Sequence, residues 1–314
     1  MSPSVRNLLR AIEMRFDAVE TRLNEALPGP LKVGFLTLYL FSTTTADRLD
    51  AAASHSAWDR WTDAGVASLF ALQVGGMALI SFAAWSALGR TRATALNDPV
   101  NAVAVPGLND FMPLAAAPYV VVGLVVATVV HEVGHAVACL RADVDVEEWG
   151  VALLLGVVPL AAYVLPDEAI DDASVRDRLR MYAVGVFHNL LVAIAALAVL
   201  YSPFAASPGE AYLTCFGWAL VGGTPPTAAT VGALGALTNC CFWLALLNAN
   251  FAVLNALPVS AFDGGRALTL ALRESTARVG VTLPPVAESA VVNGASVLAL
   301  GLVVVAVVGP ALPI

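Results

Sequence analysis

The chain has 314 residues, of which 59% are hydrophobic and 13% charged, and its mean hydropathy is +0.78. A soluble domain carries about a quarter charged residues, so this composition excludes an ordinary soluble enzyme and favours a protein that crosses the lipid bilayer several times. The net charge of −8 excludes nucleic acid as a partner, because phosphate binding needs clusters of basic residues. None of the four cysteines forms a CxxC pair, which speaks against a disulfide framework or a cysteine zinc site.

Residues 1–64 are expected to form a cytoplasmic amphipathic segment that precedes a membrane domain over 65–314. Apolar residues recur there at helical spacing among Arg and Glu, namely at Leu9, Ile12, Phe16, Val19, Leu23 and Leu27. This spacing predicts a helix that lies on a surface. The charged first 30 residues do not have the pattern of a secretory signal peptide. Residues 33–41 are apolar but too few to span, which predicts a strand or a shallow membrane contact.

Five later segments are long and apolar enough to cross about 30 Å of hydrocarbon. They are 65–88, 115–139, 182–202, 240–259 and 287–309. The sequence therefore predicts an all-α polytopic membrane protein with about five or six transmembrane helices.

Two further segments are predicted not to add a span. The apolar stretch 149–165 is short and contains Gly156 and Pro159, so we expect a re-entrant or β element that returns to the side it came from. Residues 203–238 are rich in Gly, Pro, Ala and Thr and are too few for an inserted globular domain.

The basic residues predict the orientation, because Lys and Arg favour the cytoplasmic side. With the N-terminus inside, fourteen of the sixteen Lys and Arg fall in inside segments. Arg90 and Arg92 fall outside; a further span before residue 65 would move them inside but would invert the first basic cluster or the rest of the chain. We therefore expect a cell-membrane protein with a cytoplasmic N-terminus.

His131, Glu132 and His135 form an HExxH motif inside an otherwise apolar stretch. Residues four apart share one face of a helix, so both imidazoles can reach one zinc ion while Glu132 takes a proton from water. Burying three ionisable groups in a membrane span costs several kcal/mol unless they are paired or hold a metal. This context favours a metal site over a chance match.

A catalytic zinc site needs a third protein ligand. His55 and His188 are the other histidines, and the acids from the third span onward are Glu210, Asp263, Glu274 and Glu288. Asp263 stands out because it follows the apolar run Cys240–Phe262 and lies at the depth expected for the two histidines. The alternative is a helix-end residue before Gly264-Gly265.

These residues together resemble the site-2 protease family of intramembrane zinc metalloproteases. The resemblance covers about residues 95–270 and rests on three motifs in order: HExxH, Gly185 to Asn189 as a GxxxN helix, and Asn255 to Gly264 as an NxxPxxxxDG segment. Because 203–238 cannot hold a PDZ domain, the chain is similar to the PDZ-less, archaeal-type form. Val186 and Phe262 replace the family's usual Pro and Leu.

The resemblance implies a three-helix core over about 115–270, one Zn²⁺ held by His131, His135 and Asp263, and Glu132 as general base. It implies that Asn189 assists the substrate or the oxyanion, although by itself such a residue often only bonds a neighbouring helix. The implied substrate is a membrane protein cut in or near its transmembrane segment in regulated intramembrane proteolysis, at the cytoplasmic side of the bilayer. The segment Glu148–Pro166 is similar to the family's membrane-associated β element and is expected to pair with an unwound substrate.

Several other polar residues lie in or beside the predicted spans. We interpret His188 as structural, and we expect Asn248, Asn250 and Asn255 to be able to hydrogen-bond an extended substrate. Pro258 breaks a helical ladder and frees backbone groups that need a partner or a wet cavity.

Two other functions remain open at this stage. One is a zincin-type membrane protease that cuts soluble or prenylated tails, which would need a Glu ligand on a later helix. The other is a metal transporter or inactive scaffold, against which the intact Glu132 counts. The oligomeric state is left open.

Overall fold

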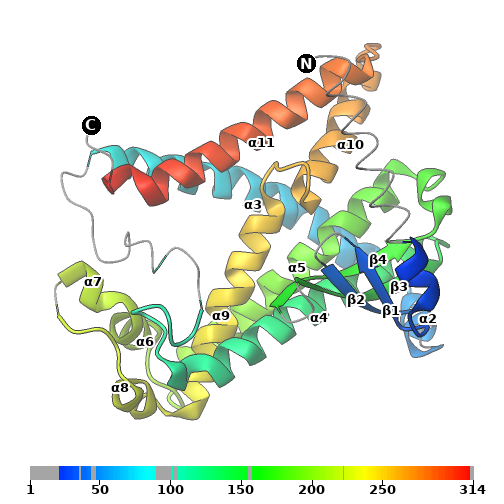
Figure 1. Ribbon diagram of the computed structural model, residues 1–314. Helices are drawn as coiled ribbons and strands as arrows, with labels where there is room; N and C mark the ends of the chain where they lie inside the picture. The colour runs from blue at the N-terminus through cyan, green and yellow to red at the C-terminus, as the bar shows by residue number, and fades with distance from the viewer. Residues whose placement is uncertain are drawn as a thin grey trace. The chain divides into compact units, whose positions relative to one another are not determined.

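The computed structural model describes residues 21–34, 37–43, 47–89, 101, 105–154, 158–221 and 223–311 (Figure 1). The predicted amphipathic helix lies mostly outside these residues; its last part, 21–26, is helical. By their internal contacts the residues form two compact units, Met1–His55 with Cys139–Ala173 and Ser56–Ala138 with Ser174–Ile314. The boundary expected between residues 64 and 65 stays a prediction.

The first unit is built on a four-stranded antiparallel sheet in the order β1-β2-β3-β4. Its strands are β1 (Leu31–Gly34), β2 (Thr37–Ser42), β3 (Val146–Leu154) and β4 (Val158–Pro166), and the short helix α2 (Asp47–Ala53) follows β2. The described residues of 33–41 thus form strands, which was one of the two alternatives, and those of 149–165 belong to the paired strands β3 and β4. Phe41 lies opposite Gly150, where a Cβ would collide with the Leu40 carbonyl.

Polar groups join the outer strands of this sheet. Lys32 of β1 forms an ion pair of 2.7 Å with Glu148 of β3, and the hydroxyl of Tyr163 on β4 donates to the same carboxylate. The Lys32 ammonium also lies 5.4–5.9 Å from the ring centres of Tyr39, Phe41 and Tyr163. One face of the sheet is therefore tied together across all four strands.

Among the described residues, five helices are long and apolar enough to cross a membrane, and they belong to the second unit. They are α3 (Ala57–Leu88), α4 (Ala117–Arg141, preceded by a 3₁₀ turn), α5 (Val175–Leu200), α9 (Gly235–Ala256) and α11 (Pro285–Val308). The predicted number of spans and the all-α class are confirmed, with the small sheet in addition.

The observed helices begin and end at other residues than the apolar segments predicted from the sequence. Helix α3 begins before residue 65 and α5 before residue 182, because their first turns are polar and stay helical. The Ser174 side chain caps α5 by accepting a hydrogen bond from the Asp177 amide. Helix α9 ends at Ala256 because Pro258 pushes Leu257 to an extended conformation, with ψ at 148°.

Residues 203–238 are more ordered than their composition suggests. They contain α6 (Pro208–Tyr212), a π-helical turn (Leu213–Gly217), α7 (Trp218–Val221) and α8 (Ala228–Ala233). Cys215 and Val231 pack in one buried cluster with Phe242 and Trp243 of α9. The connection is therefore a set of helical turns on the end of α9.

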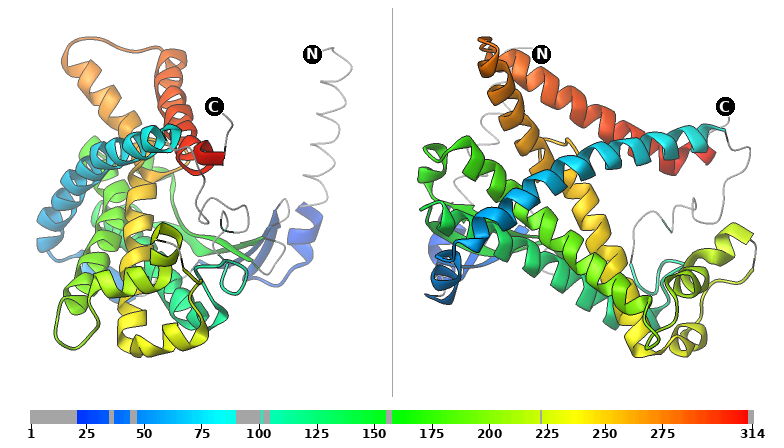
Figure 2. Two further views of the ribbon diagram at one scale, coloured as in Figure 1. Left: turned by 90° about the vertical axis from the view of Figure 1, so that its left-hand side faces the viewer. Right: turned by 180° about the vertical axis from the view of Figure 1, so that it is seen from behind.

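Close packing holds the helices of this unit together. Helix α11 runs alongside α3 (Figure 2), and Gly309 at the end of α11 lies against Ala87. Gly123 of α4 faces α9, where a Cβ would stand 2.7 Å from Leu247. Helix α10 (Asp263–Arg278) follows α9, and its Arg273 forms a two-pronged ion pair with Glu288 of α11 at 2.6 and 2.7 Å.

Candidate metal centre

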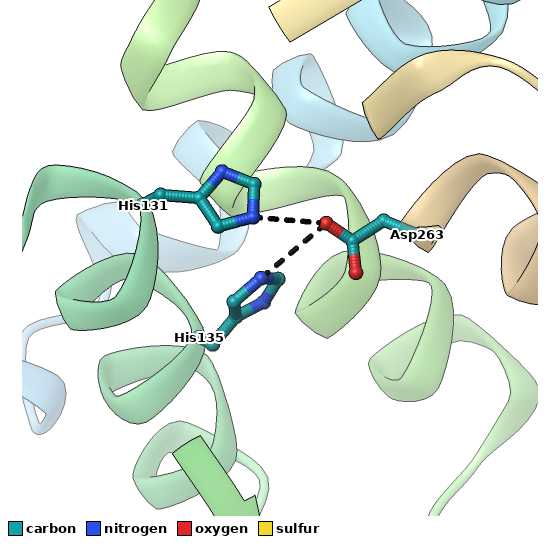
Figure 3. Close-up of side chains that lie close together, drawn as sticks. All are labelled: His131, His135 and Asp263. Atoms are coloured by element: carbon teal, nitrogen blue, oxygen red, sulfur yellow. Dashed lines mark ion pairs between the residues drawn. The ribbon is translucent and has the colours of Figure 1, made fainter. Parts of the chain in front are cut away.

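Three potential metal ligands meet inside the second unit (Figure 3). His131 and His135 lie one turn apart on α4, and Asp263 is the first residue of α10. The carboxylate oxygen Oδ2 of Asp263 lies 3.1 Å from Nε2 of His131 and 3.4 Å from Nε2 of His135. Residues about 130 positions apart in the sequence therefore place three donor atoms within 4.8 Å of one another.

The far side of each imidazole is fixed by a hydrogen-bond acceptor. Nδ1 of His131 lies 2.7 Å from Oδ1 of Asn189, and Nδ1 of His135 lies 2.7 Å from the carbonyl oxygen of Met181. Both partners belong to α5. An acceptor at this position requires the proton on Nδ1, which turns the lone pair of Nε2 toward Asp263, as in metal-binding histidines.

The donor set fits a zinc ion. Oδ2 of Asp263 is buried and makes no hydrogen bond of acceptable geometry, although two ring nitrogens lie close to it. Ligands placed about 2.0–2.1 Å from a tetrahedral zinc stand roughly 3.3 Å apart. The two separations of 3.1 and 3.4 Å are close to that value. An orphaned carboxylate oxygen that faces two imidazole lone pairs is a site for a cation.

Asn189 is the centre of a buried polar chain. Besides accepting from His131, it donates from Nδ2 to the carbonyl of Ala127 at 2.8 Å and to Oδ1 of Asn248 at 3.0 Å. Asn248 in turn donates to the carbonyl of Leu244. Asn189 and Asn248 are both fully buried. All the polar atoms of Asn189 are thus used inside the protein, and Asn248 faces Asn189.

The remaining predicted residues occupy different places. Glu132 is half-buried beside His131 on α4. Asn250 and Asn255 each donate to a carbonyl of α9 one turn earlier. His188 accepts from Nε1 of Trp61 at 2.9 Å and lies 3.0 Å from the Val130 carbonyl, which links α3, α4 and α5.

The alternative third ligands do not join the histidines. Glu274 pairs with Arg278 and Glu288 with Arg273, while Glu210 lies on the short helix α6. Among the described residues, His131, His135 and Asp263 are the group with metal-binding spacing. The sequence marked Asn248 as a possible substrate contact and gave no sign of its hydrogen bond to Asn189, and it did not indicate Met181, because a main-chain carbonyl gives no sequence signal.

Gly185 leaves the space that the ring of His131 fills. A Cβ on residue 185 would stand 2.8 Å from Nδ1 and Cε1 and 2.9 Å from Cγ of that ring. Gly185→Ala should therefore displace His131 and weaken zinc binding about tenfold or more, as measured by competition with a chelator. Gly75→Ala on α3 is the matched control, because nothing lies within 4 Å of its Cβ position. Equal zinc affinity in both variants would contradict this account of Gly185.

One comparison with known proteins identifies the family of the chain. No solved structure matches the chain. The model of Peptidase family M50 matches residues 119–302, more than half of the chain, and this stretch includes the HExxH helix, Asn189 and Asp263. The resemblance to the site-2 proteases is thereby confirmed, and the chain belongs to Peptidase family M50.

Proposed function

We propose that this peptidase is a zinc metalloendopeptidase that hydrolyses peptide bonds in or near the transmembrane segments of other membrane proteins. The observation that carries the proposal is the convergence of His131, His135 and Asp263 among helices of membrane-spanning length. A metal held by these residues would therefore lie within the part of the protein that lipid surrounds, within reach of the transmembrane segments of other proteins.

His131, His135 and Asp263 are proposed to hold one zinc ion. When bound, zinc polarises a carbonyl and makes a nucleophile available from water at neutral pH. Glu132 is the residue that receives the proton of the attacking water, and it returns the proton to the leaving amine. Its place in the chain, next to one ligand and on the same helix, favours this role.

Asn189 is proposed to assist the substrate or the transition state through His131. Its hydrogen bond fixes the ring of that ligand, and Asn248 and the Ala127 carbonyl fix Asn189. A direct contact with substrate would require one of these hydrogen bonds to be exchanged.

The proposed setting is the cell membrane, with the N-terminus and the active site toward the cytoplasm. The positive-inside bias of the sequence supports this orientation. The proposed biological role is regulated intramembrane proteolysis that releases a signalling fragment such as a transcription regulator.

The β element is proposed to contribute to substrate binding by strand addition, since β4 is at the edge of the sheet. Val151→Pro in β3 should impair cleavage and leave zinc affinity unchanged, because proline removes a ladder hydrogen bond while the three donors lie on α4 and α10. Val151→Ala is the control. Full cleavage by the proline variant would exclude a contribution of the sheet.

The function is tested by reconstituting the purified full chain in vesicles with a membrane-spanning substrate and, separately, with the same peptide sequence in soluble form. We expect cleavage of the membrane form, its loss on chelation and its return with zinc. Preferential cleavage of the soluble form would favour the zincin-type alternative. Zinc flux across the vesicle without cleavage would favour a transporter.

A further inference from the structure

The chain leaves helical geometry between the end of α9 and the start of α10. Leu257 and Phe262, at the two ends of this break, are both extended, with ψ at 148° and 164°. Leu257 and Val259 are buried, packed with Ala299 of α11 and with Met77 and Ile80 of α3. Non-helical backbone at membrane depth is tolerated only when its polar groups find partners.

Gln73 of α3 supplies partners on both sides of the break. Its Nε2 donates to the carbonyl of Ala256, the last residue of α9, at 3.0 Å, and to that of Gly264 on α10 at 2.9 Å. Gln73 is itself buried. A single amide group therefore connects the residue after the Asp263 ligand to the end of the preceding helix.

Ser296 of α11 serves the middle of the break. Its Oγ accepts from the amide of Ser260 at 2.9 Å, and the carbonyl oxygen of Pro258 lies 3.3 Å from it. The same Oγ also lies 2.8 Å from the carbonyl of Val292 in its own helix. Side chains from α3 and α11 thus bond backbone groups at the two ends and in the middle of the break, in addition to the backbone hydrogen bonds within it.

Tight packing leaves the break little freedom. A Cβ on Gly264 would collide with the carbonyl of Ala256, and one on Gly265 with the carbonyl of Val259. A Cβ on Gly76, one turn after Gln73, would stand 3.3 Å from Leu257 and Val253. Small residues let α3 and α10 approach the end of α9 closely enough for these hydrogen bonds to form.

We infer that Gln73 and Ser296 are positioning residues for the third metal ligand. By fixing the backbone on either side of Asp263, they hold its carboxylate opposite His131 and His135. Helices α3 and α11, which supply no ligand, are then part of the metal centre. The inference rests on the proposed zinc site and extends it to residues that no motif marks.

The test compares zinc dissociation constants of the purified full chain, measured by competition with a chelator. Gln73→Met keeps the length of the side chain and removes its donor, and Ser296→Ala removes one hydroxyl. Loss of a group that orients a ligand costs about 10–100-fold in metal affinity. We expect about a tenfold weakening or more for Gln73→Met, and a change in the same direction for Ser296→Ala.

The same two changes are then made in the Asp263→Ala background. Residues that act only through Asp263 should have no further effect there, within about twofold, since the two losses are coupled rather than additive. An equal loss in both backgrounds would show an action on the histidines or the fold and would overturn the inference. A zinc affinity equal to that of the wild type in both single variants would also overturn the inference.

Two controls separate this role from general stability. Thr62→Val on α3 removes a buried hydroxyl that bonds carbonyls of its own helix, and Ser289→Ala on α11 changes an exposed side chain. Both should keep the zinc affinity of the wild type; a tenfold loss in either would contradict the inference. If Gln73→Met does not fold, Ser296→Ala decides on the same terms.

The outcomes also separate the inference from the proposed function. A wild-type chain that neither binds zinc nor cleaves a membrane substrate contradicts the function. A wild type that binds and cleaves, with zinc affinity unaltered in Gln73→Met and Ser296→Ala, contradicts only the positioning role.

Discussion

Replacing Asp263 by Ala should remove most of the zinc affinity and with it all measurable cleavage. Structural zinc sites are worth about 10–16 kcal/mol over four ligands, so one ligand accounts for roughly 3–4 kcal/mol, or at least about a hundredfold in the dissociation constant. The change is measured by chelator competition, and activity by cleavage of the membrane-spanning substrate. Asp263 is a mostly buried residue whose Oδ2 has no hydrogen bond to lose, so a large structural penalty is not expected.

Asp263→Asn provides the matched comparison for this prediction. It preserves the shape of the side chain and removes only its charge, and it should show a loss of the same order. Normal zinc content and normal cleavage in both variants would mean that the third ligand lies elsewhere. The assignment of the HExxH histidines would survive that result, whereas the proposed site as a whole would not.

Replacing Glu132 by Gln should abolish turnover and leave zinc binding intact. General acid–base groups contribute about 10²–10⁴-fold to a rate, so kcat should fall by at least that range while KM changes little. The two measurements together, zinc content and single-turnover cleavage, distinguish loss of a proton acceptor from loss of the metal. The same variant would transport metal normally if transport were the function.

Glu274→Gln is the control for this prediction. It neutralises an acid on α10 whose partner is the exposed Arg278, an interaction worth about 0–1 kcal/mol. Its kcat should equal that of the wild type. A loss of zinc from Glu132→Gln would give that residue a role in holding the metal and would contradict its assignment as general base alone.

The membrane helices and the three donors could be predicted from the sequence for a clear physical reason. A run of apolar residues long enough to cross hydrocarbon is a local signal, and ionisable residues inside it are costly enough to demand a function. His131 and His135 satisfy both conditions, and Asp263 directly follows such a run. Because both histidines lie on α4, only α4 and the start of α10 have to meet to bring the three donors together.

The rest of the arrangement depends on contacts that leave no such local signal. Strand β2 pairs with β3, which lies far from it in the sequence, and neither strand indicates its partner. Gln73 appears in the sequence as one polar residue of an apolar helix, and its two carbonyl partners lie at residues 256 and 264. The short helices over 208–233 were hidden by their Gly and Pro content, because their stability comes from packing against Phe242 and Trp243.

Gly264 and Gly265 have a consequence for how genetic data on this enzyme should be interpreted. Any side chain at either position meets a main-chain carbonyl, so both positions should tolerate substitution as poorly as the residues that perform the chemistry. A mutational scan scored by activity alone would rank these glycines with His131 and Asp263. Scoring the same library by retained zinc would group them together as well, because a side chain at either glycine displaces the backbone beside Asp263, so a variant that carries all three donors would still hold one of them out of place.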